Sequence, residues 1–133
     1  MTITIDGGAG ITFPDTVQQT NGMTMTGGNP KYYAARAWVN FDGTGTVSIR
    51  AAVNVSSITD GGAGNYTVNF TTPMPDANYS VVAMPSAVDG GGNNMAFHIL
   101  DGGTFTVSAV QLLCEAGTGP NADTNIACVV VFR

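Results

Sequence analysis

Residues 60–71 of the chain read DGGAGNYTVNFT, an Asp-Gly step followed by a run that alternates apolar and polar side chains. Tyr66, Val68 and Phe70 occupy every second position of this run, which is the period of a β-strand with one buried face. Asp-Gly is typical of tight hairpins, because the type I′ turn needs positive φ at both central residues. The stretch therefore predicts a tight turn followed by a half-buried strand.

The same pattern recurs along most of the chain. Further Asp-Gly steps begin at Asp6, Asp42, Asp89 and Asp101, and the later ones stand between runs rich in Val, Ile, Thr, Phe and Tyr. Helix-forming residues are scarce, whereas Gly occurs 18 times. Strand starts spaced by about eight to twelve residues are typical of an antiparallel sandwich. We predict an all-β fold, a jelly-roll-like antiparallel β-sandwich, with strands at residues 31–41, 46–53, 65–71, 79–84, 94–100, 104–113 and 125–132.

Alternation also predicts which side chains of each strand enter the core. In residues 31–41 one face carries Tyr33, Ala35, Ala37, Val39 and Phe41, and the other carries Arg36, Trp38 and Asn40. In residues 46–53 the apolar positions are Val47, Ile49, Ala51 and Val53, against Ser48 and Arg50. The apolar set of each strand is expected to face the core.

Composition excludes several classes of function. The 133 residues are 44% hydrophobic and 10% charged, which is too apolar for a disordered chain and sufficient for one core. So little charge indicates surface that becomes covered by partners, copies of the chain included. The four basic residues are scattered and the net charge is −5, so nucleic acid is not an expected partner. The sequence has neither an apolar run of about 18 residues nor a secretory signal, so we expect no membrane insertion and synthesis in a cytoplasm.

Residues 1–30 differ from the rest, because Gly-Gly, Asn-Gly and Asn-Pro steps interrupt them and large apolar residues are few. Two forms are expected: an extended arm that orders on a partner surface, or a small hairpin added to the domain. As an arm, this segment would attach the protein, and residues 31–133 would form the sandwich. Its candidate attachment residues are Ile3, Ile5, Ile11 and Phe13.

The sequence offers little catalytic chemistry. The single histidine, His98, has no Cys, Asp or Glu at ligand spacing and is more typical of a strand face. Glu115 is the only Glu, and most Asp residues are explained by turns, which leaves no paired carboxylates. The glycine-rich stretches 7–10 and 61–64 lack the lysine of a phosphate loop and are expected to be turns. Trp38 suits a core or subunit interface better than a sugar site. We therefore expect no enzyme activity, no cofactor and no metal.

The two cysteines, Cys114 and Cys128, are too few for a disulfide scaffold. They flank one loop, so a bridge across a hairpin is one interpretation. Their apolar neighbours favour the other interpretation, two buried and reduced thiols.

Three stretches between Ala37 and Val82 resemble a module of tail-fibre-like proteins of tailed bacteriophages, particularly those of marine and freshwater hosts. They are AWVNFDGTG (37–45), NVSSITD (54–60) and NYTVNFTTPMPDANY (65–79). Upstream, GITFPD (10–15) is similar to short segments of such proteins, although Thr16 and Val17 stand where Gly and Thr commonly follow. The resemblance implies a virion structural protein, usually trimeric and exposed on the particle, without catalytic residues.

Two roles on a phage particle remain open, and both place the protein on the virion surface after synthesis in the host bacterial cytoplasm. A trimeric capsid decoration (cement) protein would bind itself and the major capsid protein, and the length of 133 residues favours this role. A tail-fibre or receptor-binding tip protein would bind a tail or adaptor protein and a host surface receptor, and the resemblance favours this alternative. A third class, a tailspike depolymerase, would need a carboxylate pair that the sequence lacks.

Overall fold

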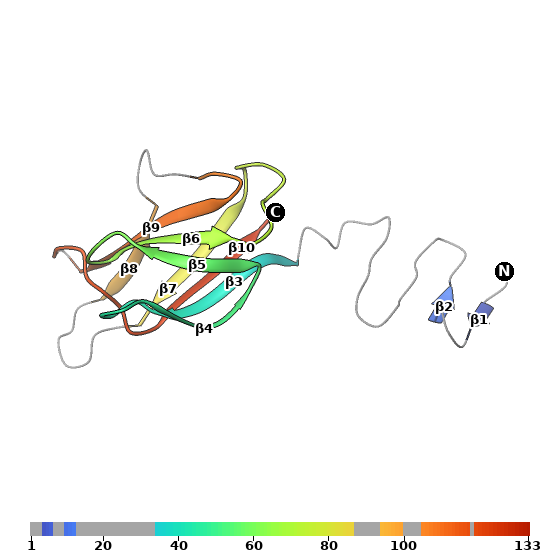
Figure 1. Ribbon diagram of the computed structural model, residues 1–133, viewed down its shortest axis with the longest axis horizontal. Coiled ribbons are helices and arrows are strands. Elements are labelled where there is room, and N and C mark those ends of the chain that lie inside the picture. Colours follow the sequence, from blue (N-terminus) through green and yellow to red (C-terminus); the bar gives the residue numbers. More distant parts are fainter. Residues whose placement is uncertain (1–3, 7–9, 13–33, 87–93, 100–104, 118) are drawn as a thin grey trace. The chain divides into compact units, whose positions relative to one another are not determined.

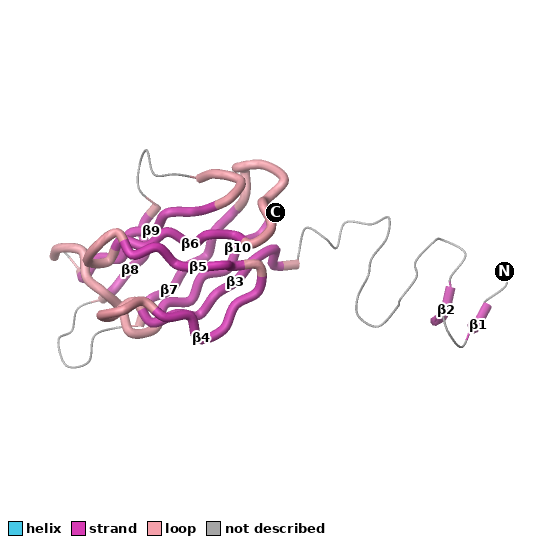
Figure 2. Tube along the Cα trace, viewed as in Figure 1, coloured by secondary structure: helices cyan, strands magenta, loops and turns pink. Residues whose placement is uncertain are grey.

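The computed structural model describes residues 4–6, 10–12, 34–86, 94–99, 105–117 and 119–133. These residues form β-strands, turns and loops and contain no helix, as the sequence predicts (Figures 1 and 2). Accordingly, the described part of the chain holds no helix of the length and apolarity needed to cross a membrane.

Eight strands form two four-stranded antiparallel sheets, and this confirms the predicted β-sandwich. What we call the β3 sheet has the strand order β4-β3-β10-β7, and the β6 sheet has the order β5-β6-β9-β8. Figure 1 shows that β3 and β10, from opposite ends of the sequence of this domain, lie side by side. The bounds in the β3 sheet are Ser48–Val53 (β4), Ala35–Asp42 (β3), Ala127–Phe132 (β10) and Ser80–Pro85 (β7). Those in the β6 sheet are Val55–Asp60 (β5), Asn65–Phe70 (β6), Ala109–Ala116 (β9) and Met95–His98 (β8).

The N-terminal segment forms a unit of its own. Contacts within the chain divide it into Met1–Ala34 and Ala35–Arg133. In the first unit β1 (Thr4–Asp6) and β2 (Gly10–Thr12) pair antiparallel. Residues 31–33 of the predicted first strand lie outside the described residues, and β3 begins at Ala35.

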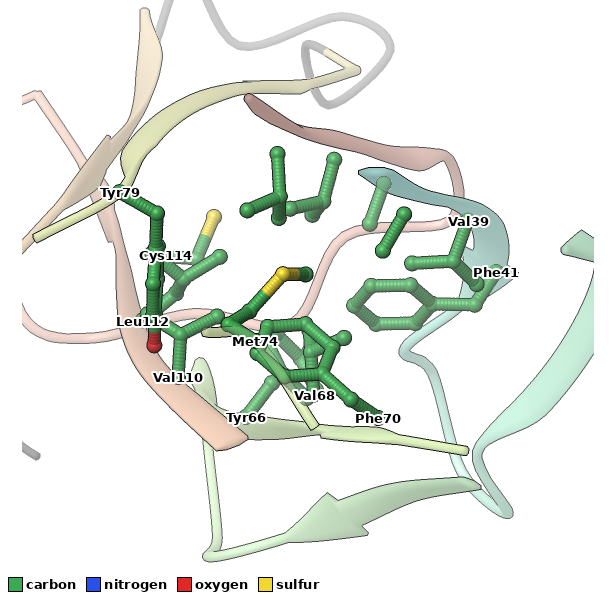
Figure 3. Packing of buried hydrophobic residues seen from close by; sticks show 14 residues of the cluster. Val39, Phe41, Tyr66, Val68, Phe70, Met74, Tyr79, Val110, Leu112 and Cys114 are labelled. Carbon is green, nitrogen blue, oxygen red and sulfur yellow. The ribbon is translucent and has the colours of Figure 1, made fainter. Parts of the chain in front are cut away.

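The core lies between the two sheets and follows the predicted alternation (Figure 3). From β6, Tyr66, Val68 and Phe70 are buried. The rings of Phe41 and Tyr66 meet edge to face across the sheets, with centroids 5.2 Å apart. Each aliphatic or aromatic side chain buried in this way contributes about 1.5–3 kcal/mol relative to an exposed one. The other buried apolar residues are Ala37, Val39, Met74, Tyr79, Val110, Leu112, Cys114, Ala127, Val129 and Val131.

The predicted apolar face of residues 46–53 is right at Val47, which packs against the core, and wrong at Ala51 and Val53, because a β-bulge interrupts the pairing of β4 with β3. Asn40 pairs with Ala51 but Phe41 pairs with Ile49, so Arg50 is an extra residue. An extra residue shifts the inward and outward positions by one. As a result Ala52 packs against the core, whereas Val53 is 51% exposed.

One strand is absent from the sequence prediction. Strand β5 pairs with β6 at the edge of the β6 sheet, and only Val55 and Ile58 of its side chains pack against the core. An edge strand with so few apolar residues gives a weak alternation pattern. Its exposed residues are Ser56, Ser57, Thr59 and Asp60.

Strand β9 starts at Ala109, later than the predicted 104–113, and continues to Ala116. The delay has a local cause, because Thr106 Oγ1 accepts a hydrogen bond from the Ala109 amide at 2.9 Å. Side-chain acceptors of this kind turn the chain and compete with strand pairing. The turn is held further by the Tyr79 hydroxyl, which donates to Ala109 O at 2.9 Å.

Two Asp-Gly steps lie in hairpin turns as predicted, but their turn type is not I′. Asp42 is the last residue of β3, before the turn to β4, and Asp60 is the last residue of β5, before the turn to β6. Neither Asp has positive φ, since Asn54 is the one non-glycine residue with positive φ in the described part. Each carboxylate instead accepts a hydrogen bond from the amide two residues on, Asp42 from Thr44 at 2.9 Å and Asp60 from Gly62 at 2.8 Å. These Asp residues close turns through their side chains.

Candidate functional site

The side of the β3 sheet that faces away from the core is largely apolar. Two rows of paired residues cross its four strands, and we call these eight residues the outer face. The first row is Val53, Trp38, Val130 and Val82; the second is Ala51, Asn40, Cys128 and Met84. Their exposed fractions include 37% for Trp38, 58% for Val82 and 69% for Met84. An antiparallel sheet with a solvated side normally places polar residues there, so this face departs from the usual pattern.

Charge is confined to the two ends of the outer face. Neither row contains an ionisable group other than the Cys128 thiol. Beyond the second row, Asp42 and Arg50 form an ion pair at 2.9 Å, and Arg36 lies toward the start of β3. An apolar centre with a polar rim is the anatomy of a protein–protein interface. The outer face is therefore the candidate functional site.

Strands β7 and β10 carry the sequence signal for this site. Their apolar runs, Val81–Met84 and Ala127–Phe132, continue without the polar positions of a half-buried strand. Side chains of Val81 and Ala83 pack on the core, while Val82 and Met84 point outward. Continuous apolar runs are typical of strands covered on both faces. The unbroken apolar runs, and not the alternation within single strands, are the feature of the sequence that indicates this site.

Trp38 lies on the outer face and is 37% exposed. Of the two predicted places for this residue, the core is therefore wrong, and a subunit interface stays a prediction. Beside Trp38 on the outer face, the Asn40 side-chain amide donates to Cys128 Sγ at 3.2 Å. Within the described residues Asn40 Oδ1 is buried and has no hydrogen-bond partner. The two polar side chains of the second row therefore bond to each other across β3 and β10.

Both cysteines are free, but only one is buried. Cys114 faces the core from β9, and burial, together with the Asp123 charge, raises the pKa of its thiol to about 11. Cys128 is exposed on the outer face. The expectation of two buried thiols is thus right for Cys114 and wrong for Cys128, because Val129 and Val131, not Cys128, take the inward positions of β10. The Cys114 side chain faces the core from one sheet, and the Cys128 side chain faces away from the core on the other sheet. The two thiols therefore form no disulfide.

A groove of about 460 Å³ lies between the edge strands β7 and β8. It includes His98, whose Nε2 lies 3.5 Å from Glu115 Oε2 on the neighbouring strand β9. Sequence spacing did not reveal this pair, because it depends on the β8–β9 register, which places Ala96 opposite Glu115. One half-exposed imidazole and one carboxylate do not make a metal site, and the described residues contain no group of three metal-ligating side chains. The groove is otherwise lined by Val81, Val82, Ala83, Phe97, Ile99 and Leu112.

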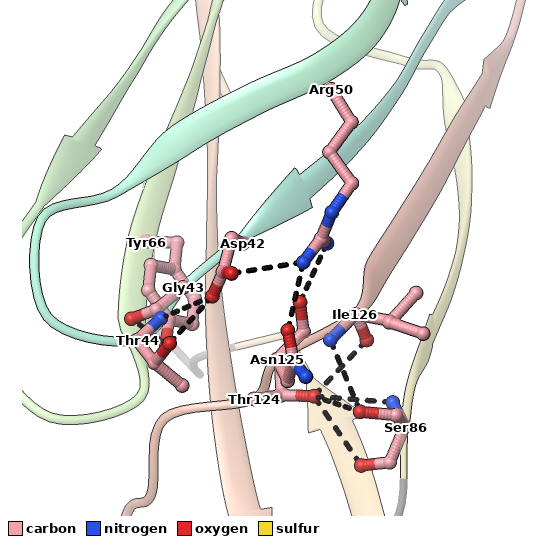
Figure 4. Close-up of polar contacts among 9 residues, drawn as sticks. All are labelled: Asp42, Gly43, Thr44, Arg50, Tyr66, Ser86, Thr124, Asn125 and Ile126. Atoms are coloured by element: carbon pink, nitrogen blue, oxygen red, sulfur yellow. Dashed lines mark hydrogen bonds and ion pairs between the residues drawn. The ribbon is translucent and has the colours of Figure 1, made fainter.

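The polar cluster at one end of the sandwich is structural (Figure 4). Arg50 donates to Asn125 O at 2.6 Å and to Asn125 Oδ1 at 2.8 Å, besides its pair with Asp42. Hydrogen bonds from Thr44 and the nearby Arg50 charge hold the pKa of Asp42 below its usual value. Thr124, which is buried, bonds through Oγ1 to Ser86 and to Ile126 O. These groups satisfy one another and tie the loop before β10 to β4 and to the end of β7.

Tyr66 connects the two sheets beneath this cluster. Its hydroxyl lies 3.0 Å from Asp123 Oδ1 and 3.1 Å from Gly43 O. Burial, with the Asp123 hydrogen bond and charge, raises the pKa of Tyr66 well above its usual value. A phenol held in this way stays protonated and serves as a hydrogen-bond donor between loops.

Asp76 provides a test of pH dependence. Arg133 donates to both of its carboxylate oxygens, and the Asn78 amide donates to Oδ1 at 2.8 Å. These bonds lower the pKa of Asp76, so its stabilising contribution is present above pH about 4 and is lost as the pH falls through the lowered value. We expect Asp76→Asn to reduce the loss of stability between neutral and acidic pH. Urea midpoints measured at neutral pH and below pH 4 check this, and an unchanged difference between them would contradict it.

The four candidate attachment residues are placed only in part. Ile5 in β1 and Ile11 in β2 are paired directly across the N-terminal hairpin. Ile3 and Phe13 lie outside the described residues.

Comparison with known proteins identifies no relative of this chain. No protein-family model matches the sequence, and neither the curated proteins nor the solved structures give a significant match.

Proposed function

We propose that this chain is a non-enzymatic structural protein on the outer surface of a tailed bacteriophage particle, a homotrimeric capsid decoration protein. The observation that carries this proposal is the outer face, an apolar surface with a charged rim on the β3 sheet, which has the anatomy of a protein–protein interface. A decoration protein needs a compact body, contacts between its copies and an attachment to the capsid lattice. The sandwich is the body and the outer face is the contact surface.

The three stretches that resemble the phage module, 37–45, 54–60 and 65–79, consist mainly of residues that fold the domain. The stretch 37–45 contains the inward side of β3 and the turn closed by Asp42. The stretch 54–60 contains Asn54 and β5, and 65–79 contains β6 and the partner of Arg133. Residues that fold the domain are shared when a module is reused with different attachments. The resemblance therefore supports a virion surface module without naming what it binds.

Attachment is assigned to residues 1–30, which belong to the separate N-terminal unit. Each apolar side chain of that segment that becomes buried on a capsid protein contributes about 1.5–3 kcal/mol. Three segments acting together hold a trimer far more firmly than one, because the second and third contacts form within one complex.

The test is sedimentation of the full chain with phage capsids that lack it. We expect it to co-sediment with capsids, and intact particles to carry it in hundreds of copies. The receptor-binding alternative, favoured by the resemblance, replaces the proposal if the chain binds host cells but not capsids. A copy number of a few to some tens per particle would also favour a tail location.

A further inference from the structure

We propose that the outer face of the β3 sheet is the surface through which copies of this chain pack against one another. The inference rests on the proposed function only for the number of copies, three around a threefold axis with their outer faces turned inward. The surface itself is argued from the sandwich.

Strands β7 and β10 show that this face is built to be covered. The outward side chains Val82, Met84 and Val130 are apolar, like the inward side chains of the same strands that pack in the core. A solvated strand would carry Thr, Ser, Lys or Glu at such positions. In a single chain Val82 is 58% exposed and Met84 is 69% exposed, so association would bury an apolar surface that is otherwise in contact with water.

Charge favours a second copy as that cover. The chain has a net charge of −5, so two copies repel each other wherever their carboxylates approach. The outer face is the place where they meet without this cost, since its rows carry no carboxylate and Asp42 at its end is paired with Arg50. A strongly basic partner would instead be drawn to exposed carboxylates such as Asp60 and Asp123, which lie outside the outer face.

The size of the face sets the strength of the contact. Its two rows span about four residues on each of four strands, which at about 4.8 Å between strands and 3.3 Å per residue gives about 250 Å² in projection. Specific interfaces bury about 800 Å² of accessible surface per partner, so this contact is smaller than a standard interface. We therefore expect association that reverses on dilution in the purified protein and that attachment to a particle reinforces.

Cys128 is a natural reporter for the proposed contact, because it stands in the second row of the outer face. Association covers this thiol, whereas Cys114 is buried in every state and reacts only after unfolding. In the purified full chain we expect sedimentation to show a trimer that dissociates on dilution. The rate at which a thiol reagent modifies Cys128 should rise several-fold over the same dilution.

Two lysine substitutions at opposite edges of the face test the location. Val53→Lys and Met84→Lys point into solvent in a single chain but place a charge in the contact. Both variants should sediment as single chains with fast Cys128 modification. Val107→Lys is the matched control, because Val107 is similarly exposed, at 43%, in the turn before β9 and outside the outer face. It should behave like the unmodified chain.

Several outcomes would overturn the inference: a single chain at all concentrations, Cys128 modification that is independent of concentration, or association that survives both lysines. If a lysine variant does not fold, as judged by circular dichroism, Cys128 protection in the unmodified chain decides. A dimer with protected Cys128 and lysine sensitivity would support the face and overturn the threefold arrangement. Because no phage particle is present, failure to bind capsids is a separate result that concerns the proposed function alone.

Discussion

Replacement of Gly64 by Ala is expected to destabilise the protein by about 3–5 kcal/mol, enough to unfold much of a marginally stable domain. Gly64 lies in the turn between β5 and β6 with φ of +66°. A Cβ there would overlap Cys114 O and lie 2.8 Å from Ala122 N, and both are backbone atoms that cannot swing aside. The same backbone is fixed by hydrogen bonds from Cys114 N to Gly64 O at 2.7 Å and from Ala122 N to Cys114 O at 3.0 Å. Urea unfolding followed by tryptophan fluorescence measures the change.

Gly45→Ala is the matched control for this prediction. Gly45 has nearly the same φ, +61°, but a Cβ there meets no atom within 4 Å. Its cost should therefore be only the left-handed backbone conformation, about 1–2 kcal/mol. Equal losses in the two variants would show that φ alone matters and that the packing of Gly64 against β9 does not.

The local rules of the sequence account for much of the fold. Strict alternation at Tyr66, Val68 and Phe70 predicts their burial, because a strand between two neighbours has one face on the core. The Asp residues at 42 and 60 predict turns, because a short carboxylate closes a turn in more than one way, even though the type I′ expectation fails.

What the sequence does not reveal depends on register, which is a property of two strands together. The extra residue Arg50 in β4 moves Val53 to the outer side, and no feature of β4 alone predicts it. The pairing of His98 with Glu115 likewise follows from where β8 meets β9. The outer face, by contrast, can be predicted from the sequence, since the unbroken apolar runs of β7 and β10 indicate strands covered on both faces.

Asn54→Ala is expected to cost about 2–4 kcal/mol, because this residue alone links β4 in one sheet to β5 in the other. Its φ of 55° lies in the left-handed region. Its side chain donates to Arg36 O and Thr72 O, each at 3.1 Å, and accepts from Thr72 N at 2.7 Å. Ala removes all three bonds and is also less favourable than Asn at this φ. Thermal and urea unfolding of the full chain measure the loss.

Two further variants separate the two causes at Asn54. Asn54→Gly tolerates the left-handed conformation and loses only the side-chain bonds, so it should be less destabilised than the Ala variant by about 1 kcal/mol. Asn54→Asp keeps an acceptor for Thr72 N, but its carboxylate cannot donate to Arg36 O and Thr72 O and faces two carbonyl oxygens instead. If the Asn54→Asp variant is as stable as the unmodified protein, the two hydrogen bonds that Asn54 donates do not stabilise the connection between β4 and β5. If Gly and Ala are equal, the left-handed backbone contributes nothing, and the hydrogen bonds alone explain why an amide stands where the chain passes from one sheet to the other.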